Sequence, residues 1–245
     1  MAESSTEFTG RAMVIVGGSV GVGPAVVEAF LERGARVASG EEGDGHPASL
    51  PMQARAIPLD LATAESRRAF LDRCEAELGG LDLLVISARP FKTAKILDTA
   101  PDHLARVIEE ELIQIALCLQ EAARRMAARG RGRIISFVSM SGKTGVHQGA
   151  GPYAAAKGGL ITFSRVLAAE LASTGVTVNC IATALLEPQV APWTEERRRE
   201  VAQEIPVRRF GRAVEAAHAV LYLASDKGGY VTGETMNLSG GRFMD

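Results

Sequence analysis

Tyr153 and Lys157 are the two side chains of this sequence whose types and spacing most clearly suggest catalysis. They are four residues apart, so on a helix they share one face. The pKa of a free tyrosine is about 10, which is too high for a base at neutral pH. An ammonium about 4 Å away, at an effective dielectric constant of about 20, favours the phenolate by about 4 kcal/mol, which lowers the pKa by roughly 3. We therefore expect Lys157 to bring the pKa of Tyr153 to about 7, where the phenol can give a proton to a carbonyl oxygen or take one from an alcohol.

The assignment rests on Tyr153 because the chain has only three tyrosines. Tyr222 and Tyr230 are followed four residues later by Asp226 and Glu234, so neither has a lysine at the same spacing. The competing interpretation is that Tyr153 and its lysine form an ordinary surface pair.

A glycine-rich segment, residues 17–23, follows the first apolar stretch of the chain and precedes a segment of helical period. Glycines in a turn from strand to helix let the backbone approach a pyrophosphate, and the start of the helix supplies free N–H groups and a partial positive charge. The segment therefore predicts a dinucleotide site, although glycines alone would also suit a tight turn.

Uniformly apolar segments of strand length alternate with segments of helical period along the chain. Apolar strands separated by helices indicate a parallel sheet covered on both faces. We predict an α/β fold, a single doubly wound, Rossmann-like domain over residues 1–245 with a mostly parallel seven-stranded sheet. The expected strands are Ala12–Val16, Arg36–Ser39, Arg55–Leu59, Leu81–Ser87, Arg133–Ser139, Val176–Ile181 and Thr235–Leu238. The expected helices are Pro24–Glu32, Ala64–Leu78, His103–Ala128, about Gly151–Ser173 and one or two between Thr194 and Ala224, with a loop at Gly40–Pro47.

Composition argues against several classes of partner. The 27 Lys and Arg nearly balance the 29 Asp and Glu, so the net charge of −2 gives no bulk attraction to nucleic acid or to an anionic membrane. The Arg129–Arg133 tract resembles an RNA-binding tract, but it falls where a helix must end on glycine. The first ten residues are polar, no apolar run is long enough to span a bilayer, and the three cysteines lie far apart without metal-ligand spacing. We expect a cytoplasmic protein with reduced thiols, no metal, no nucleic acid and no membrane partner.

Several ordered motifs together resemble the short-chain dehydrogenase/reductase family. They are Gly17-x-x-x-Gly21-x-Gly23, Tyr153-x-x-x-Lys157 and a serine, Ser139, fourteen residues before the tyrosine at the end of the fifth strand. Flanking segments that also match are Leu81–Val85, Gly132–Ile135, Gly175–Asn179 and Tyr230–Gly241. The resemblance runs from about Gly10 to the C-terminus and is closest to members of the 3-oxoacyl-acyl-carrier-protein reductase type.

This resemblance implies an oxidoreductase that interconverts a secondary alcohol and a ketone by hydride transfer with a nicotinamide cofactor. Tyr153 would act as the acid or base, Lys157 would tune it and bind the ribose, and Ser139 would hold the substrate oxygen. Enoyl reduction is disfavoured because relatives that perform it separate the Tyr and Lys by more than three residues. The partners would be a small alcohol or ketone and further copies of the chain, a tetramer by resemblance. The implied cofactor contacts are Gly17, Ser19, Val20, Gly21, Val22, Gly23, Glu41, Asp60, Leu61, Ser87, Ala88, Tyr153, Lys157, Thr183 and Leu186.

The end of the second strand should set the cofactor choice. Glu41 aligns with the acid of NAD-dependent relatives, where a carboxylate accepts from the adenosine ribose hydroxyls and repels a 2′-phosphate. No Lys or Arg lies in residues 17–23 or 40–54. We expect NAD, with NADP not excluded, because the loop leaves open which of Glu41, Glu42 and Asp44 points inward. Asp60 resembles the residue that meets the adenine amino group, or it simply caps the next helix.

Five positions around the expected cofactor depart from the family pattern. Val16 stands for Thr, Ile86–Arg89 for Asn-Asn-Ala-Gly, Thr183–Ala184 for Pro-Gly, Pro188 for Thr, and Glu111 for the Asn of the catalytic tetrad. These changes keep a second function open, a nucleotide-binding family member with weak or no turnover that serves binding or regulation.

Glu111 is the most informative departure. An ionised carboxylate about 7 Å from Lys157 and Tyr153 would oppose deprotonation of the phenol by about 2.4 kcal/mol and move the activity optimum to higher pH. It could instead replace Asn as an acceptor in a water relay to Lys157. A third possibility is that it belongs with Glu109 and Glu110 to a solvated helix face.

The substrate side should lie in the segments beyond the strand ends. The pattern of residues 185–206 predicts a lid with an apolar inner face and a charged outer helix. Its Trp193 would contact an apolar or cyclic substrate or would anchor the lid. Arg89 would attract an anionic substrate group, screen the pyrophosphate or lie solvated at the surface, and His147 is a candidate for the pocket.

Overall fold

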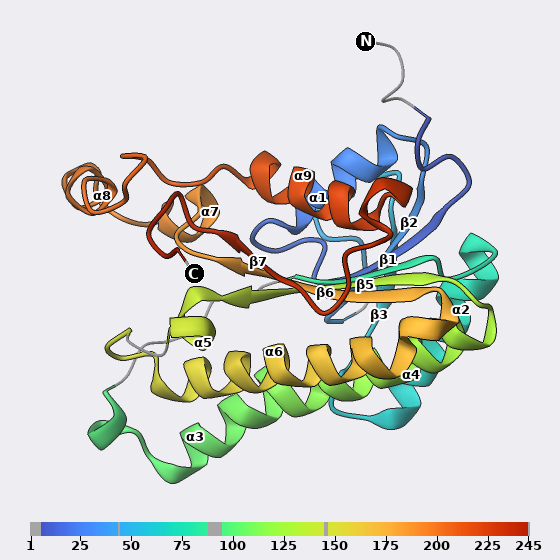
Figure 1. Ribbon diagram of the computed structural model, residues 1–245, viewed down its shortest axis with the longest axis horizontal. Coiled ribbons are helices and arrows are strands. Elements are labelled where there is room, and N and C mark those ends of the chain that lie inside the picture. Colours follow the sequence, from blue (N-terminus) through green and yellow to red (C-terminus); the bar gives the residue numbers. More distant parts are fainter. Residues whose placement is uncertain (1–5, 44, 88–94, 145–146, 245) are drawn as a thin grey trace.

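A computed structural model of the protein describes residues 6–43, 45–87, 95–144 and 147–244. Its strands form one sheet in the order β3-β2-β1-β4-β5-β6-β7, and in the described residues all neighbouring strands are parallel (Figure 1). The predicted Rossmann-like fold class is therefore confirmed. The strands are β1 (Ala12–Val16), β2 (Arg36–Glu41), β3 (Arg55–Pro58), β4 (Leu83–Ile86), β5 (Gly132–Ser139), β6 (Val176–Thr183) and β7 (Thr235–Leu238).

Helices cover both faces of this sheet. Figure 1 shows α1 and α9 on one face and α2, α4 and α6 on the other. The helices are α1 (Gly23–Leu31), α2 (Ala64–Leu78), α3 (Pro101–Ile108), α4 (Gln114–Ala128), α5 (Met140–Thr144), α6 (Gly151–Leu171), α7 (Glu187–Val190), α8 (Glu195–Ala202) and α9 (Ala213–Ala224). Within the described ranges, no helix is both long and apolar enough to cross a lipid bilayer.

The uniformly apolar strands follow from this double cover. On β1, Val14 packs in the core beneath α2, α4 and α6, whereas its neighbours Met13 and Ile15 pack in the core beneath α1 and α9. Successive side chains of a strand point to opposite faces, so a strand covered on both sides needs an apolar residue at every position. All five residues of β1 are buried accordingly.

Two elements differ from the expectations. The loop expected at Gly40–Pro47 begins later, because β2 continues to Glu41 and pairs there with Pro58 of β3. Gly40 is a packing residue rather than a loop residue, since a Cβ there would lie 2.6 Å from Leu59 and 2.9 Å from Phe70. The single long helix expected at His103–Ala128 is interrupted by a π-helical turn, Glu109–Ile113, between α3 and α4.

The direction of chain progression reverses at β1, which pairs with β2 on one side and β4 on the other. In open α/β sheets, ligands bind outside the carboxyl ends of the strands at such a switch point. The glycine-rich segment follows β1 at this place, and Ser87 follows β4 there. Ser87 donates its backbone N–H to the Val16 carbonyl at 3.0 Å, which holds the two strand ends together.

The Arg129–Arg133 tract lies at the opposite, amino-terminal edge of the sheet, where it surrounds a buried carboxylate. Asp82 accepts a hydrogen bond from the Ala12 N–H at 2.9 Å and lies 3.1 Å from Arg131 and 3.8 Å from Arg129. The tract therefore has a structural partner within the fold.

Asp82→Ala is expected to lower the free energy of unfolding by about 2 kcal/mol, because it leaves a buried N–H of β1 without its acceptor. Urea denaturation measures this loss. The matched control is Asp226→Ala, which removes an exposed carboxylate from Arg11 and should cost under about 1 kcal/mol. Equal losses in the two variants would contradict a special role for the buried carboxylate.

Candidate active site

Tyr153 and Lys157 lie together in the interior at the start of α6. Both side chains are buried, and the Lys157 Nζ lies 5.4 Å from the centre of the Tyr153 ring. A surface pair is therefore excluded. Ser139 is the last residue of β5, at the carboxyl edge of the sheet, and its Oγ accepts a hydrogen bond from the Ser141 N–H at 3.1 Å. Helix α5 begins at the next residue and packs against α6, which links the serine to the helix that carries the other two (Figure 1).

Glu111 reaches this pair from the π-helical turn. Its Oε2 lies 2.8 Å from the Lys157 Nζ, and Glu111 is only 8 % exposed. The possibility that Glu111 belongs to a solvated helix face is therefore wrong, although Glu109 and Glu110 of the same turn are exposed. The direct contact also leaves no need for a relay water between Glu111 and Lys157.

The expected pKa of about 7 for Tyr153 is wrong in this structure. Burial raises the pKa of the phenol well above its ordinary value, and the nearby Glu111 carboxylate raises it further. The sequence argument treated the phenol as solvated and Lys157 as an isolated charge, whereas the phenol is buried and Lys157 lies 2.8 Å from a carboxylate.

The glycine-rich segment forms the turn between β1 and α1. Gly21 has a φ of +58°, a left-handed conformation that glycine adopts without steric cost. A Cβ at Gly23 would lie 2.4 Å from the Gly17 carbonyl oxygen, so only glycine fits at the start of α1. Ser87 closes the turn from β4, where its Oγ donates to the Val20 carbonyl at 3.4 Å. The predicted residues Gly17, Ser19, Val20, Gly21, Val22, Gly23 and Ser87 are thus brought together.

Glu41 is turned toward this loop and away from open solvent. Its carboxylate accepts hydrogen bonds from the Ser19 N–H at 3.1 Å, from the Ser19 hydroxyl and from the Ser39 hydroxyl at 2.5 Å. Ser39 in turn accepts from the Gly18 N–H at 2.9 Å. Glu41, the predicted ribose acceptor, therefore connects the glycine-rich loop to the end of β2 by hydrogen bonds.

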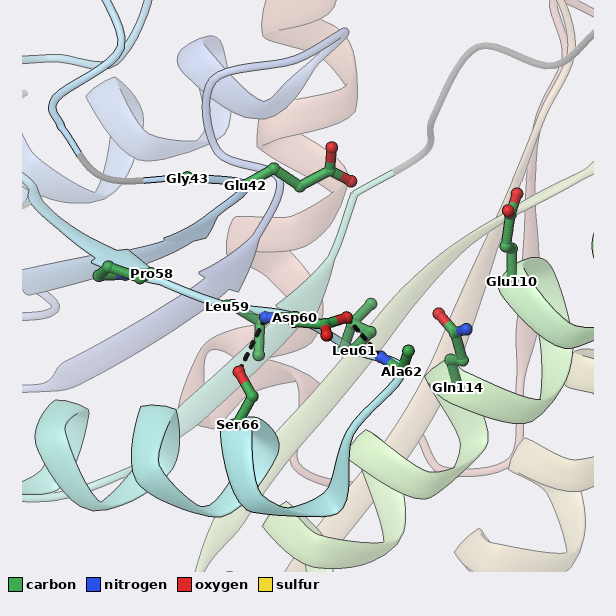
Figure 2. A pocket seen from close by; sticks show the side chains of 10 residues that line it. All are labelled: Glu42, Gly43, Pro58, Leu59, Asp60, Leu61, Ala62, Ser66, Glu110 and Gln114. Atoms are coloured by element: carbon green, nitrogen blue, oxygen red, sulfur yellow. Dashed lines mark hydrogen bonds between the residues drawn. The ribbon is translucent and has the colours of Figure 1, made fainter.

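A pocket of about 480 Å³ lies at the ends of β2 and β3 (Figure 2). Glu42, Asp60 and Glu110 contribute carboxylates to its lining, and Gln114 contributes an amide. None of the ten described residues that line it is basic. The sequence had left Glu42 open as an alternative to Glu41, but nothing in the pattern marked Glu110 or Gln114. These two reach the pocket from its other side, Glu110 from the π-helical turn and Gln114 from the start of α4 (Figure 2).

Asp60 does not cap the helix that follows it. Thr63 performs that task, with its hydroxyl accepting from the Ser66 N–H at 3.2 Å. The Asp60 carboxylate instead accepts from the Ala62 N–H at 2.9 Å within the pocket wall, as Figure 2 shows. Leu61 lines the same pocket.

The remaining predicted cofactor contacts differ in whether the structure leaves them open to a ligand. Thr183 ends β6 opposite Ser139 of β5, at the carboxyl edge. Leu186 has its side chain in the core and donates its N–H to the Gln189 side chain at 2.9 Å, so neither group is open to a ligand. Ala88 and Arg89 lie outside the described residues, as does Asp44.

Two observations indicate that the residues present suit a nicotinamide dinucleotide. The Lys157 ammonium is fully buried and, beyond its ion pair with Glu111, has no hydrogen-bond acceptor among the residues described. A pair of ribose hydroxyls would satisfy it. A Cβ at Gly23 would meet the backbone of Gly17 and Gly18, so the glycine lets the turn close tightly at the start of α1, and a helix N-terminus of this kind suits a pyrophosphate.

The expected lid comprises α7 and α8. Trp193 packs edge-on against Phe210, with ring centres 6.4 Å apart, and the Arg197 guanidinium lies 4.3 Å from the indole. These contacts favour the interpretation of Trp193 as an anchor of the lid over that of a substrate contact. His147 lines a pocket of about 460 Å³ with Met140, Lys143, Thr144, Arg242 and Phe243.

Comparison with known proteins agrees with this arrangement. The family described as Enoyl-(Acyl carrier protein) reductase matches residues 17–242. The 3-oxoacyl-(acyl-carrier-protein) reductases of Salmonella typhimurium and Escherichia coli are each 34 % identical to the chain over 242 residues, which is 97 % of this chain and 99 % of the relative. Nodulation protein G of a Rhizobium species is 34 % identical over 243 residues, with the same two shares. The chain therefore belongs to the short-chain dehydrogenase/reductase family, whose members are oxidoreductases that use a nicotinamide cofactor.

Proposed function

We propose that the protein interconverts a secondary alcohol and a ketone by hydride transfer with NAD(H). The observation that carries this proposal is the burial of Tyr153 and Lys157 side by side in the fold that positions a glycine-rich dinucleotide loop. A phenol in such a place can exchange a proton with the oxygen of a bound carbonyl or alcohol. The names of the relatives, two of which are 3-oxoacyl reductases, support a ketone as the group reduced.

Each residue has one task in this mechanism. In reduction, the Tyr153 hydroxyl donates its proton to the ketone oxygen, and Ser139 holds that oxygen by a hydrogen bond. A bound nicotinamide would supply the hydride that reduces the carbonyl carbon. Lys157 would hold the ribose hydroxyls with the N–H groups that Glu111 leaves unused. In oxidation the proton returns from the alcohol to the phenolate.

A screen of alcohols and ketones with NAD(H) and NADP(H), followed by nicotinamide absorbance, tests the proposal. Turnover of at least one secondary alcohol or ketone is the expected result. Binding of the cofactor without turnover of any substrate would favour the second candidate function, a binding or regulatory protein that retains the fold.

The acidic pocket supports NAD over NADP. A 2′-phosphate at the adenosine ribose would lie near the carboxylates of Glu42 and Asp60, and the described residues that line this pocket offer no cation to receive it. Two like charges about 7 Å apart repel by about 2.4 kcal/mol at an effective dielectric constant of about 20, which is more than a tenfold preference.

We expect kcat/KM to be at least about tenfold higher with NADH than with NADPH, and Glu42→Gln to reduce this ratio severalfold by removing one repelling charge. Initial rates with both cofactors measure the ratio. Glu196→Gln, on the exposed lid helix α8, makes the same charge change away from the pocket and should leave it unaltered. A wild-type preference for NADPH would refute the assignment.

The same proposal includes self-association and a cytoplasmic location. Leu104 of α3, Leu117 of α4 and Val166 of α6 are exposed apolar side chains, which supports burial of this outer helical layer between copies of the chain. The mass of the particle in solution tests for the tetramer.

The three cysteines are buried and free, which suits a reducing compartment such as the cytoplasm.

A further inference from the structure

We propose that Glu111 is a positioning residue of this site, whose carboxylate holds the Lys157 ammonium in place and offsets its charge at the Tyr153 phenol. The inference rests on the proposed function and adds to it a control over the pH range in which the phenol works.

The first support is the geometry of the contact. The carboxylate and the ammonium are 2.8 Å apart, on two different elements, and Lys157 is fully buried while Glu111 is 8 % exposed. Two buried charges at this distance are costly to separate, so the pair fixes where the long Lys157 side chain ends. Among the described residues, Glu111 is the only carboxylate within ion-pair distance of Lys157.

The second support is the backbone that delivers the carboxylate. Glu111 is the middle residue of the π-helical turn Glu109–Ile113, closed by a hydrogen bond from the Gln114 N–H to the Glu109 carbonyl. A π turn is a rare interruption of an α-helix and is frequently found at functional sites. Here it places one of three consecutive glutamates in the interior and leaves the other two, Glu109 and Glu110, exposed.

The third support is electrostatic. Burial and the Glu111 carboxylate together raise the pKa of Tyr153, whereas an uncompensated ammonium at the same place would lower it. Cys180 of β6 also faces Lys157, and burial raises the pKa of its thiol to about 11, so it adds no charge at neutral pH. The other charged groups on elements packed against α6 are exposed or engaged elsewhere. The exposed groups are Asp102 and Arg106 of α3 and Glu109 and Glu110 of the π turn, and His103 of α3 is hydrogen-bonded to Arg106. Lys143 of α5 donates to Thr235 and Asn237, and Arg133 of β5 donates to two carbonyls. Glu121, Arg124 and Arg125 of α4 form ion pairs.

The consequence is a pH profile displaced to the alkaline side. Reduction needs the protonated phenol, so its kcat/KM is constant below the pKa of Tyr153 and is lost as the pH rises through it. With Glu111 present, that loss falls above the range of an ordinary tyrosine, beyond about pH 10. Without the carboxylate, the Lys157 charge acts on the phenol alone and the loss comes at lower pH.

Glu111→Gln tests this inference, because it removes the charge and keeps the length of the side chain. The alkaline loss of reductive kcat/KM is expected to move down by about one pH unit or more. Glu109→Gln makes the same change on the exposed side of the same π turn and is expected to leave the profile in place. Glu111→Asp, which keeps the charge, should restore most of the wild-type profile.

Absorbance titration of the phenol provides a readout without turnover. Tyr222 and Tyr230 are exposed, so the signal of Tyr153 is isolated by subtracting a titration of Tyr153→Phe. In the wild type we expect Tyr153 to ionise after the two exposed tyrosines, and in Glu111→Gln with them or before them. Where Glu111→Gln does not fold, Glu111→Asn takes its place in both measurements.

The outcomes separate the two proposals. An unchanged pH profile and an unchanged titration of Tyr153 in a folded Glu111→Gln or Glu111→Asn protein would overturn the role of Glu111. A wild-type protein that turns over no alcohol or ketone would overturn the proposed function, and the titration would then still decide whether Glu111 governs the phenol.

Discussion

Replacing Tyr153 with phenylalanine is expected to lower kcat for ketone reduction by about 10²- to 10⁴-fold, the usual contribution of a positioned general acid. The phenol is buried in the interior at the start of α6, where solvent does not readily replace its proton. Removing only the hydroxyl leaves the ring, the Lys157–Glu111 ion pair and the glycine-rich loop unchanged. The loss should therefore appear in the chemical step, and the dissociation constant of NADH should change little.

Single-turnover rates of nicotinamide oxidation and a fluorescence titration of bound NADH measure the two quantities separately. Tyr222→Phe is the matched control, since it removes an exposed hydroxyl from α9 and should leave both quantities unchanged. A Tyr153→Phe protein that retains full turnover would remove the phenol from the mechanism and with it the main support for the proposed function.

The sequence predicted the sheet because the burial of strands on both faces leaves a pattern in consecutive residues. Val14 and Ile15 must both be apolar when opposite cores receive them, and that requirement is readable without coordinates. The glycine-rich turn was readable for a similar reason, since the residues that form it are contiguous.

Orientation of polar side chains was less predictable, because distant residues decide it. Glu41 aligned with the acid of NAD-dependent relatives, but the sequence left open whether it or Glu42 points inward, and in the structure the hydroxyls of Ser39 and Ser19 bind Glu41 at the glycine-rich loop. The role of Glu111 depended on a π turn, which has no reliable sequence pattern. The error in the expected pKa of Tyr153 came first from the burial of the phenol and then from the Glu111 carboxylate, neither of which is visible in the spacing of Tyr153 and Lys157.

Lys157→Met is expected to lower the free energy of unfolding by about 3–5 kcal/mol, because it leaves the Glu111 carboxylate buried without its counter-ion. The change preserves most of the side-chain volume, so packing should contribute little to the loss. Turnover should fall as well, since the variant lacks the N–H groups offered to the ribose. Urea denaturation followed by circular dichroism measures the stability.

The double variant Glu111→Leu, Lys157→Met distinguishes a charge effect from a packing effect. Replacing both members of a buried ion pair with apolar residues of similar size is often neutral or stabilising, so the double variant should recover most of the stability lost in Lys157→Met. It should not recover turnover, because the ribose contact is still missing. Arg73→Met provides the control, since its ion pair with Glu77 is largely exposed and its loss should cost under about 1 kcal/mol. If the double variant were as unstable as Lys157→Met, the loss would come from packing, and the buried charge pair would not be what holds α6 to the π turn.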